Sequence, residues 1–290
     1  MNSPYTEPEL GPAPTPATPD HSRAVLRVAI AGLGAVGLRV AHALDEGLPG
    51  CELVAVSAHD RVRAAERLAH LRRPVPVVPV EELEALADVV VECAPAALLP
   101  AIAAPFLRAG KTVIVLSSGA ILAHQELVEL ARTHGGQIVV PTGALLGLDA
   151  VTAAAEGDIR SVRMITRKPV KGLVGAPYLV EHHIAIDDIT EPLRIFDGTP
   201  REAAIGFPAN LNVAVALALA GIGPDRTRLE IWADPALTRN THTIEVDADS
   251  ASFTMSIANI PTDNPKTGRI TALSVISYLR KLNAPLRVGS

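Results

Sequence analysis

The sequence predicts an α/β protein: a doubly wound parallel sheet followed by a second, α+β domain with a mostly antiparallel sheet. Three observations predict this fold class. Short apolar runs alternate with helical patterns up to about residue 141, a glycine-rich turn joins the first run to the first helix, and later runs alternate apolar and polar residues. The chain of 290 residues is long enough for two domains of ordinary size.

The first half of the chain has the pattern of a parallel sheet. Strands that are covered on both faces are continuous β-branched runs, and such runs occur at residues 24–33, 53–57, 89–93, 112–116 and 137–140. Helices are predicted at residues 34–48, 61–71, 81–87, 98–109 and 125–134, with a short extended segment at 75–78. Because strands and helices alternate, the strands should be parallel and carry helices on both faces.

The second half has a different pattern. Apolar and polar residues alternate at residues 160–166, 228–233, 242–247 and 252–257, which is typical of antiparallel strands with one buried face. Helices are predicted at residues 201–207, 210–221 and 271–282. We therefore expect a disordered proline-rich tail (1–22), a first domain (23–141), an α+β domain (142–264) and a C-terminal helix that packs back on the first domain (265–290).

The composition excludes several classes of protein. Asp and Glu (31) outnumber Lys and Arg (26), so the basic excess of nucleic-acid-binding proteins is missing. The mean hydropathy of +0.28 is high, but the longest charge-free apolar stretch, residues 207–224, is interrupted by proline, asparagine and glycine, so we expect no membrane span. Residues 1–22 carry no secretory signal, and two cysteines make no disulfide framework, so we expect a cytoplasmic protein.

A glycine-rich turn follows the first predicted strand, where Gly32, Gly34 and Gly37 form G-x-G-x-x-G and open a helix. Gly32 permits the tight turn, Gly34 lets a pyrophosphate approach the backbone, and Gly37 lets the helix pack on the strand. With Ala35 and Val36, this turn offers free N–H groups at the positive end of the helix dipole. The sequence therefore predicts a Rossmann-type domain that binds NAD or NADP.

The choice between these two cofactors stays open. An acidic residue about 20 positions after the glycine turn usually bonds the adenosine ribose of NAD. Asp60 is the candidate for this role. Ser57, His59 and Arg61 surround it and would instead suit the 2′-phosphate of NADP.

Later segments occur in an order that is typical of one family. These segments are SSGA (117–120), PTGALLGLD (141–149), FPANLNV (207–213), ADP (233–235), RNTH (239–242) and NPKT (264–267). Together with the glycine turn they resemble the L-aspartate dehydrogenase family over residues 26–283. The chain departs from the family pattern at Leu146, where the family has a glycine, and in its proline-rich tail.

The resemblance implies an activity and the residues that serve it. The family uses NAD or NADP to oxidise L-aspartate to iminoaspartate, which yields oxaloacetate and ammonia or feeds quinolinate and NAD biosynthesis. The reverse reaction is the reductive amination of oxaloacetate. His242 matches the family's catalytic position and suits proton transfer near neutral pH. Ala144 and either Asn210 or Asn212 match cofactor contacts, the asparagine through the nicotinamide carboxamide.

Further candidates follow from position and charge. Ligands bind at the carboxyl ends of parallel strands, which adds Ala94 for the cofactor and Ser118 and Gly119 for the substrate. A dicarboxylate needs cationic partners, for which Lys168 and Lys266 are candidates, although most such lysines belong to a solvated surface.

Two other functions also remain open. One is another two-domain NAD(P)-dependent oxidoreductase, similar to dihydrodipicolinate reductase or homoserine dehydrogenase, and the other is a non-catalytic NAD-binding protein. The FPANLN and RNTH segments favour the dehydrogenase of L-aspartate. No metal is expected, because His182 and His183 would face opposite sides of a strand. The expected partners are L-aspartate or oxaloacetate, ammonia and a second copy of the chain, with neither nucleic acid nor membrane.

Overall fold

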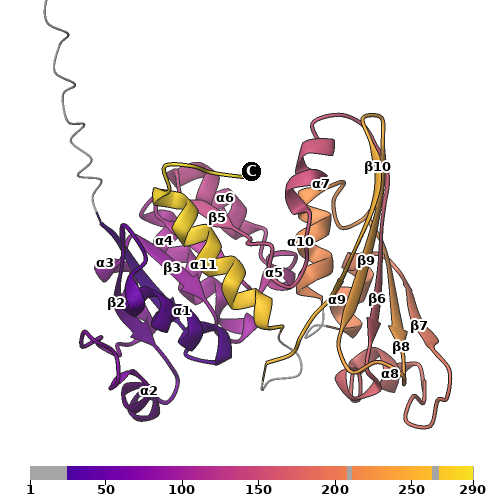
Figure 1. The fold of residues 1–290 in the computed structure, drawn as a ribbon, viewed down its shortest axis with the longest axis horizontal. Coiled ribbons are helices and arrows are strands. Elements are labelled where there is room, and N and C mark those ends of the chain that lie inside the picture. The colour runs from indigo at the N-terminus through magenta and orange to yellow at the C-terminus, as the bar shows by residue number, and fades with distance from the viewer. Residues whose placement is uncertain (1–24, 208–210, 263–267, 290) are drawn as a thin grey trace, which may run out of the picture.

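The computed structural model describes residues 25–207, 211–262 and 268–289, which form two sheets with their helices (Figure 1). The predicted tail of residues 1–22 lies outside the described residues, and so do Asn210 and Lys266. No helix in the described ranges is both long enough and apolar enough to cross a membrane.

Five parallel strands form the first sheet, in the order β2-β1-β3-β4-β5. The strands are β1 (Leu26–Ala31), β2 (Cys51–Ser57), β3 (Val89–Glu92), β4 (Thr112–Val115) and β5 (Gln137–Val139). The predicted doubly wound parallel sheet is confirmed. Because the strand order reverses between β1 and β3, the connections that follow these strands diverge and leave a crevice at the carboxyl edge of the sheet.

Helices cover both faces of this sheet. One face packs on α1 (Ala35–Gly47), α2 (Arg61–Leu68) and α11 (Arg269–Asn283), and the other on α3 (Leu83–Leu86), α4 (Leu99–Arg108) and α6 (Glu126–His134). The short turns η1 (Val80–Glu82) and η2 (Ala96–Leu98) precede α3 and α4. α11 returns from the end of the chain and lies by α1, where its buried Val275 and Leu279 share one core with Val40 and Leu44 (Figure 1).

The second sheet is mixed and mostly antiparallel, as predicted, in the order β10-β9-β6-β8-β7, with β6 and β8 parallel. Its strands are β6 (Ile159–Lys168), β7 (Leu193–Gly198), β8 (Arg228–Ala233), β9 (Thr241–Ala248) and β10 (Ser252–Ala258). The helices that share its core are α7 (Leu148–Ala154), α8 (Pro177–Glu181), α9 (Pro200–Gly206) and α10 (Asn212–Ala220), with the turn η3 (Val170–Gly172) after β6. In the described part of the chain, no helix covers the opposite, outer face (Figure 1).

The structure differs from the predicted elements where the sequence pattern is short or broken. β7 was not predicted because its register shifts between Arg194 and Phe196, which buries the consecutive residues Ile195 and Phe196 and breaks the alternation. α5 (Ser118–Ile121), α7 and α8 span seven residues or fewer, too few to show a helical period. In the expected extended segment at 75–78, only Val77 pairs, in a single bridge to Val56.

The placement of the histidine pair in a strand is wrong. His182 is the cap that ends α8, and His183 follows it with a left-handed backbone (φ 53°). Over the described ranges, no group of three or more His, Cys, Asp or Glu side chains is arranged to hold a metal ion.

Candidate active site

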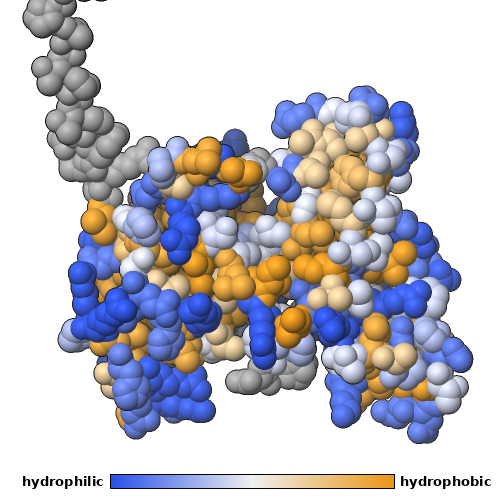
Figure 2. All heavy atoms as spheres, viewed as in Figure 1, coloured by the Kyte–Doolittle hydropathy of each residue, from blue (hydrophilic) through white to orange (hydrophobic). Residues whose placement is uncertain are grey.

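A cavity of about 280 Å³ lies between the two domains, at the carboxyl ends of β1, β3 and β4. The surface is indented between the two halves of the molecule (Figure 2). The cavity is lined from the first domain by residues that include Gly34, Ala35, Val36, Ala94 and Ser118, and from the second by residues that include Ala144, Lys168, Asn212, His242 and Asn259. Most of the residues predicted from the sequence therefore meet in one place, although they are spread over more than 200 positions.

The glycine turn has the geometry of a phosphate cradle. Gly32 has φ +100°, and a Cβ there would lie 2.5 Å from the carbonyl oxygen of Cys93. A Cβ on Gly37 would lie 2.0 Å from the carbonyl oxygen of Gly32, so α1 can approach the turn only because residue 37 is glycine. Gly34 differs: a Cβ there would meet nothing within 4 Å, and no side chain caps the helix. The space above Gly34 and the free N–H groups of α1 therefore fit a pyrophosphate.

The alternation of the second sheet places His242 and Lys168 in the cavity. Inward-facing residues on β6 alternate from Met164 through Thr166 to Lys168, and on β9 His242 continues the inward row of Ile244. Thr166 and His242 are direct partners across the two strands. The imidazole and the ammonium therefore stand at the ends of apolar rows, where the core opens into the cavity, and His242 and Lys168 are only 2% and 4% exposed.

Burial controls the protonation of His242. It lowers the pKa of the imidazole to about 3, and the positive charge of Lys168 adds to this effect. The sequence predicted a group that titrates near neutral pH, whereas the pKa of the buried imidazole lies well below that range. The Oγ1 of Thr166 lies 3.1 Å from Nδ1 of His242, and this contact holds the ring in place.

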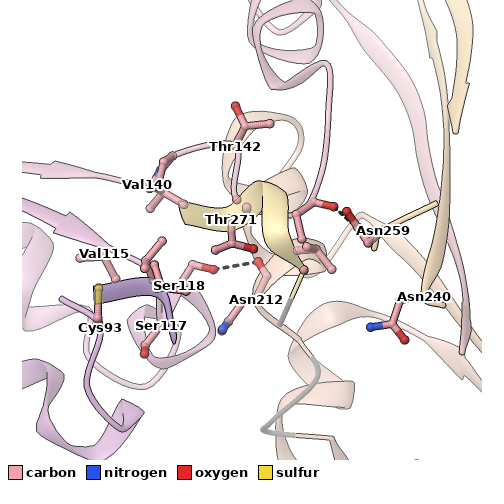
Figure 3. A pocket seen from close by; sticks show the side chains of 18 of the residues that line it. Cys93, Val115, Ser117, Ser118, Val140, Thr142, Asn212, Asn240, Asn259 and Thr271 are labelled. Carbon is pink, nitrogen blue, oxygen red and sulfur yellow. Dashed lines mark hydrogen bonds between the residues drawn. The ribbon is translucent and has the colours of Figure 1, made fainter. Parts of the chain in front are cut away.

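Asn212 joins the two domains at the cavity. Ser118 Oγ donates to the carbonyl oxygen of Asn212 at 2.7 Å, and Gly119 N donates to Asn212 Oδ1 at 3.1 Å. The side-chain oxygen of Asn212 is thus used to hold α10 against α5, and its amide nitrogen points away from Ser118 (Figure 3). Gly119 itself does not line the cavity and acts through this contact.

Asn259, just after β10, is a site residue that the sequence interpretation missed. Its Nδ2 donates to the carbonyl oxygen of Ala144 at 2.7 Å, and its backbone N donates to the carbonyl oxygen of Asn240 at 2.8 Å (Figure 3). Its Oδ1 is buried and has no hydrogen-bond partner among the described residues. A buried acceptor without a donor is costly, so this oxygen is suited to an N–H group of a ligand.

Glu92, the last residue of β3, is a second residue that was missed. Its carboxylate is 0% exposed and accepts four hydrogen bonds: Oε1 from Ala94 N (3.1 Å) and Ser117 Oγ (3.0 Å), and Oε2 from Leu116 N (3.1 Å) and Ser117 N (2.9 Å). Burial raises the pKa of Glu92, and these hydrogen bonds oppose the rise. A lone acid in the apolar run VVVEC was the available signal, because a strand covered on both faces tolerates a carboxylate only where it is fully bonded.

The Asp60 carboxylate serves a local role. Its Oδ1 accepts a hydrogen bond from the backbone N of Arg63 at 3.0 Å, so Asp60 is the N-cap of α2. The residue does not line the cavity.

A parallel sheet with a glycine turn, joined to a second domain whose buried histidine lines the same cavity as that turn, defines the class of nicotinamide-dinucleotide-dependent oxidoreductases. Residues 32–141 match the family model described as homoserine dehydrogenase, NAD binding domain, and residues 149–282 match the model described as aspartate dehydrogenase, C-terminal.

Curated relatives match nearly the whole chain. L-aspartate dehydrogenase 3 of Bordetella bronchiseptica is 61% identical over 270 residues, covering 93% of this chain and 99% of that protein. L-aspartate dehydrogenase of Bradyrhizobium diazoefficiens is 59% identical over 265 residues, covering 91% and 94%. The crystal structure of aspartate dehydrogenase from Thermotoga maritima shares the fold with a TM-score of 0.67 at 22% identity, covering 91% and 99%. The chain belongs to the L-aspartate dehydrogenase family.

The buried imidazole predicts a pH dependence of stability. The folded-state pKa of His242 is about 3, whereas an unfolded histidine titrates near 6.5. Between these values the unfolded chain binds a proton that the folded chain does not, so this contribution to stability is complete above pH 6.5 and is lost as the pH falls towards 3. Between pH 7.5 and pH 5 the free energy of unfolding of the wild type should fall by about 2 kcal/mol more than that of His242→Gln, measured by urea unfolding at both pH values.

The control is His70→Gln, because His70 is exposed on the surface. It should keep the wild-type pH dependence. If the free energy of unfolding changed with pH by the same amount in the wild type and in His242→Gln, the prediction would be contradicted.

The Glu92 carboxylate predicts a shared loss of stability and cofactor affinity. Glu92→Gln keeps the shape but replaces one acceptor by an N–H₂ group that faces donors, so at least one backbone N–H loses its partner. The free energy of unfolding should fall by about 2 kcal/mol, and cofactor binding should weaken because Ala94 and Ser117 line the cavity. Glu156→Gln is the control and should change neither quantity, because Glu156 is exposed and forms no ion pair with the other described residues. Wild-type stability and affinity in Glu92→Gln would overturn the prediction.

Proposed function

We propose that this protein oxidises L-aspartate with NAD or NADP to iminoaspartate, which is hydrolysed to oxaloacetate and ammonia or used for quinolinate and NAD biosynthesis. The reverse reaction is the reductive amination of oxaloacetate. The observation that carries the proposal is the pair of His242 and Lys168, buried in the same cavity as the glycine turn.

The described residues fit the cofactor. The open space above Gly34 and the N-terminus of α1 would hold the pyrophosphate. Asn212, Ala144 and Asn259 line the same cavity and would be the candidates to bind the nicotinamide carboxamide, since Oδ1 of Asn259 has no partner among the described residues. The bound cofactor supplies the oxidant that takes a hydride from C2 of the substrate.

Lys168 suits the charge of a dicarboxylate. A carboxylate that leaves water for a closed cavity needs a cation or several N–H donors. Lys168 is 4% exposed and lines the cavity, so its ammonium would hold one carboxylate of aspartate. The same contact affects His242, because the Lys168 charge is one cause of the low pKa of this histidine. Substrate binding would therefore offset that charge and raise the affinity of the imidazole for a proton.

His242 acts as the general base. Its neutral imidazole would take a proton from the substrate ammonium through Nε2, which frees the nitrogen lone pair that the C2=N bond requires. NAD or NADP held at the glycine turn would supply the two-electron oxidant for the C2 hydrogen. Once this proton has passed to solvent, the same nitrogen is neutral again and would accept a proton from the water that attacks the imine carbon. Thr166 keeps the ring in place, because its hydroxyl lies 3.1 Å from Nδ1.

Two substitutions separate these roles. His242→Asn should lower kcat by about 100-fold or more, since general base catalysis is lost, with an unchanged cofactor dissociation constant. Lys168→Met should raise the KM for aspartate by about 10-fold or more, since a charge-assisted contact is lost. Both kcat and KM are measured from the absorbance at 340 nm. The forward assay contains aspartate and NAD(P)⁺, and the reverse assay contains oxaloacetate, ammonium and NAD(P)H.

Lys171→Met is the matched control, because Lys171 is an exposed lysine of η3. It should leave KM unchanged. An unaltered kcat in His242→Asn would remove this residue from the mechanism. If the wild type binds the cofactor but consumes none with either substrate pair, the non-catalytic alternative holds.

The outer face of the second sheet supports a homodimer. This face carries an ion-pair network in which Arg163 bonds Glu230 (2.6 Å) and Glu245 (2.9 Å), next to the single tryptophan of the chain, Trp232, whose Nε1 donates to Glu230 (2.9 Å). A flat sheet face without a covering helix can pair with its copy across a two-fold axis. The other proposed partners are the small-molecule substrates alone, and the free thiols of Cys51 and Cys93 suit the reducing cytoplasm.

The dimer can be tested on the outer face. Light scattering should give about twice the chain mass of 30.3 kDa. Thr243→Arg adds a bulky charge on this face, at the start of β9, where Thr243 bonds Ser256 at 2.7 Å, and should produce monomers. Ser250→Arg, at the exposed turn between β9 and β10, is the matched control and should stay dimeric. A wild type that is monomeric, or a dimeric Thr243→Arg, would reject this interface.

A further inference from the structure

We propose that this chain prefers NADP to NAD and that Arg67 of α2 is the residue that holds the 2′-phosphate. The inference rests on the dinucleotide-binding part of the proposed function and decides between the two cofactors. Three features of the adenosine end of the site carry it: the end of β2, the cap of α2 and a contact from Arg67 to the glycine turn.

The end of β2 offers no carboxylate to a ribose. In NAD-specific sites an acid near this strand end accepts hydrogen bonds from the ribose hydroxyls. Here β2 ends at Ser57, whose carbonyl oxygen accepts a hydrogen bond from Gly32 N at 2.7 Å, so this strand end adjoins the glycine turn. Ala58 and His59 follow. The next acid, Asp60, has one carboxylate oxygen occupied as the cap of α2.

Arg67 brings a cation to the same place. Its Nη1 donates to the carbonyl oxygen of Leu33 at 2.9 Å, and Leu33 is the residue between Gly32 and Gly34. The guanidinium therefore lies between the glycine turn and α2, the helix that follows β2. The adenosine ribose belongs here, because the pyrophosphate sits on the turn and the ribose reaches towards the end of β2.

The charge of this arginine is not neutralised. The partner of its Nη1 is an uncharged carbonyl, and none of the ion pairs within the described ranges includes Arg67. A guanidinium has five N–H donors, so the contact to Leu33 leaves enough of them to bind a phosphate through two parallel bonds. The side chain is half-buried, which strengthens its attraction for an anion relative to a fully solvated one.

The neighbouring residues favour an anion as well. From residue 57 to residue 67, the chain carries Arg61, Arg63 and Arg67 against two acids, Asp60 and Glu66. A ribose with two hydroxyls gains little from this surplus of positive charge, whereas a 2′-phosphate gains a charge-assisted contact. The preference for NADP therefore follows because this site presents the guanidinium of Arg67, whereas an NAD-specific site presents a carboxylate to the ribose.

The experiment measures binding without substrate. The full-length protein is titrated with NADPH and with NADH, and the nicotinamide fluorescence reports the dissociation constants. The wild type should bind NADPH at least about tenfold more tightly than NADH. Arg67→Ala should weaken NADPH binding at least about tenfold and change NADH binding by less than about threefold. Arg67→Lys, which keeps the charge, should recover part of the preference.

Two controls come from the same segment. Arg63→Ala should leave both dissociation constants unchanged, because Arg63 is exposed on the same helix and contributes its backbone N–H to the cap. Asp60→Asn retains a capping oxygen and should also leave NADH binding unchanged. A selective loss of NADH affinity in Asp60→Asn would assign the ribose to Asp60 and overturn the proposal.

Two further results would also overturn it. One is a wild type that binds NADH as tightly as NADPH. The other is an Arg67→Ala variant that weakens both cofactors equally, which would make Arg67 a support of the glycine turn only. The outcome is separable from the proposed activity. A protein that binds NADPH through Arg67 but does not oxidise aspartate refutes the activity alone, and an aspartate dehydrogenase that prefers NAD refutes the cofactor assignment alone.

Discussion

The four hydrogen bonds to the Glu92 carboxylate fix the segments that follow β3 and β4, which line the cavity. β3 and β4 pair through residues 92 and 115, and beyond these residues the two chains leave the sheet. The carboxylate bridges them, because Oε1 is bonded to Ala94 and Oε2 to Leu116 and Ser117. Removing a carboxylate from water costs several kcal/mol, and four donors repay that cost only if the loops stay where they are. The buried charge therefore makes the backbone positions of both strand ends mutually dependent.

The second sheet places polar side chains in the cavity while the core beneath it stays apolar. Its inward rows are apolar up to the edge of the sheet and end in Thr166, Lys168 and His242. The pleat of two neighbouring strands thus sets the direction of the imidazole and the ammonium together, since Thr166 and His242 are register partners. A base and a cation that would repel each other when both are charged coexist here because burial keeps the imidazole neutral.

Local patterns were sufficient to predict most of the fold and the parts of the site that come with their own signature. The glycine turn and the alternating pattern of each strand are recognised from residues that lie close together in the sequence. The RNTH segment pointed to His242 in the same way. Asn259 and Arg67 could not be found in this way, because their partners are 115 and 34 positions away. Glu92 stands out locally as a lone acid in an apolar run, but its bonds to Ser117, 25 positions away, do not. What defines these residues is a donor or acceptor that only the tertiary structure brings within reach. β7 escaped for a related reason: the shift in its pairing with β8 removes the alternation that marks a strand.

The return of α11 to the first domain means that the chain passes between the domains twice, once after β5 and once after β10. Near the cavity the two passages are tied to each other, because Asn259 Nδ2 donates to the carbonyl oxygen of Ala144 and Gly143 N donates to Ser274 Oγ at 3.1 Å. Both connections therefore lie at the cavity itself, because Gly143, Ala144 and Asn259 are among the residues that line it. The segments that join the two domains are thus also part of the wall of the site, so a substitution at Ala144 or Asn259 would alter the joint and the cavity together.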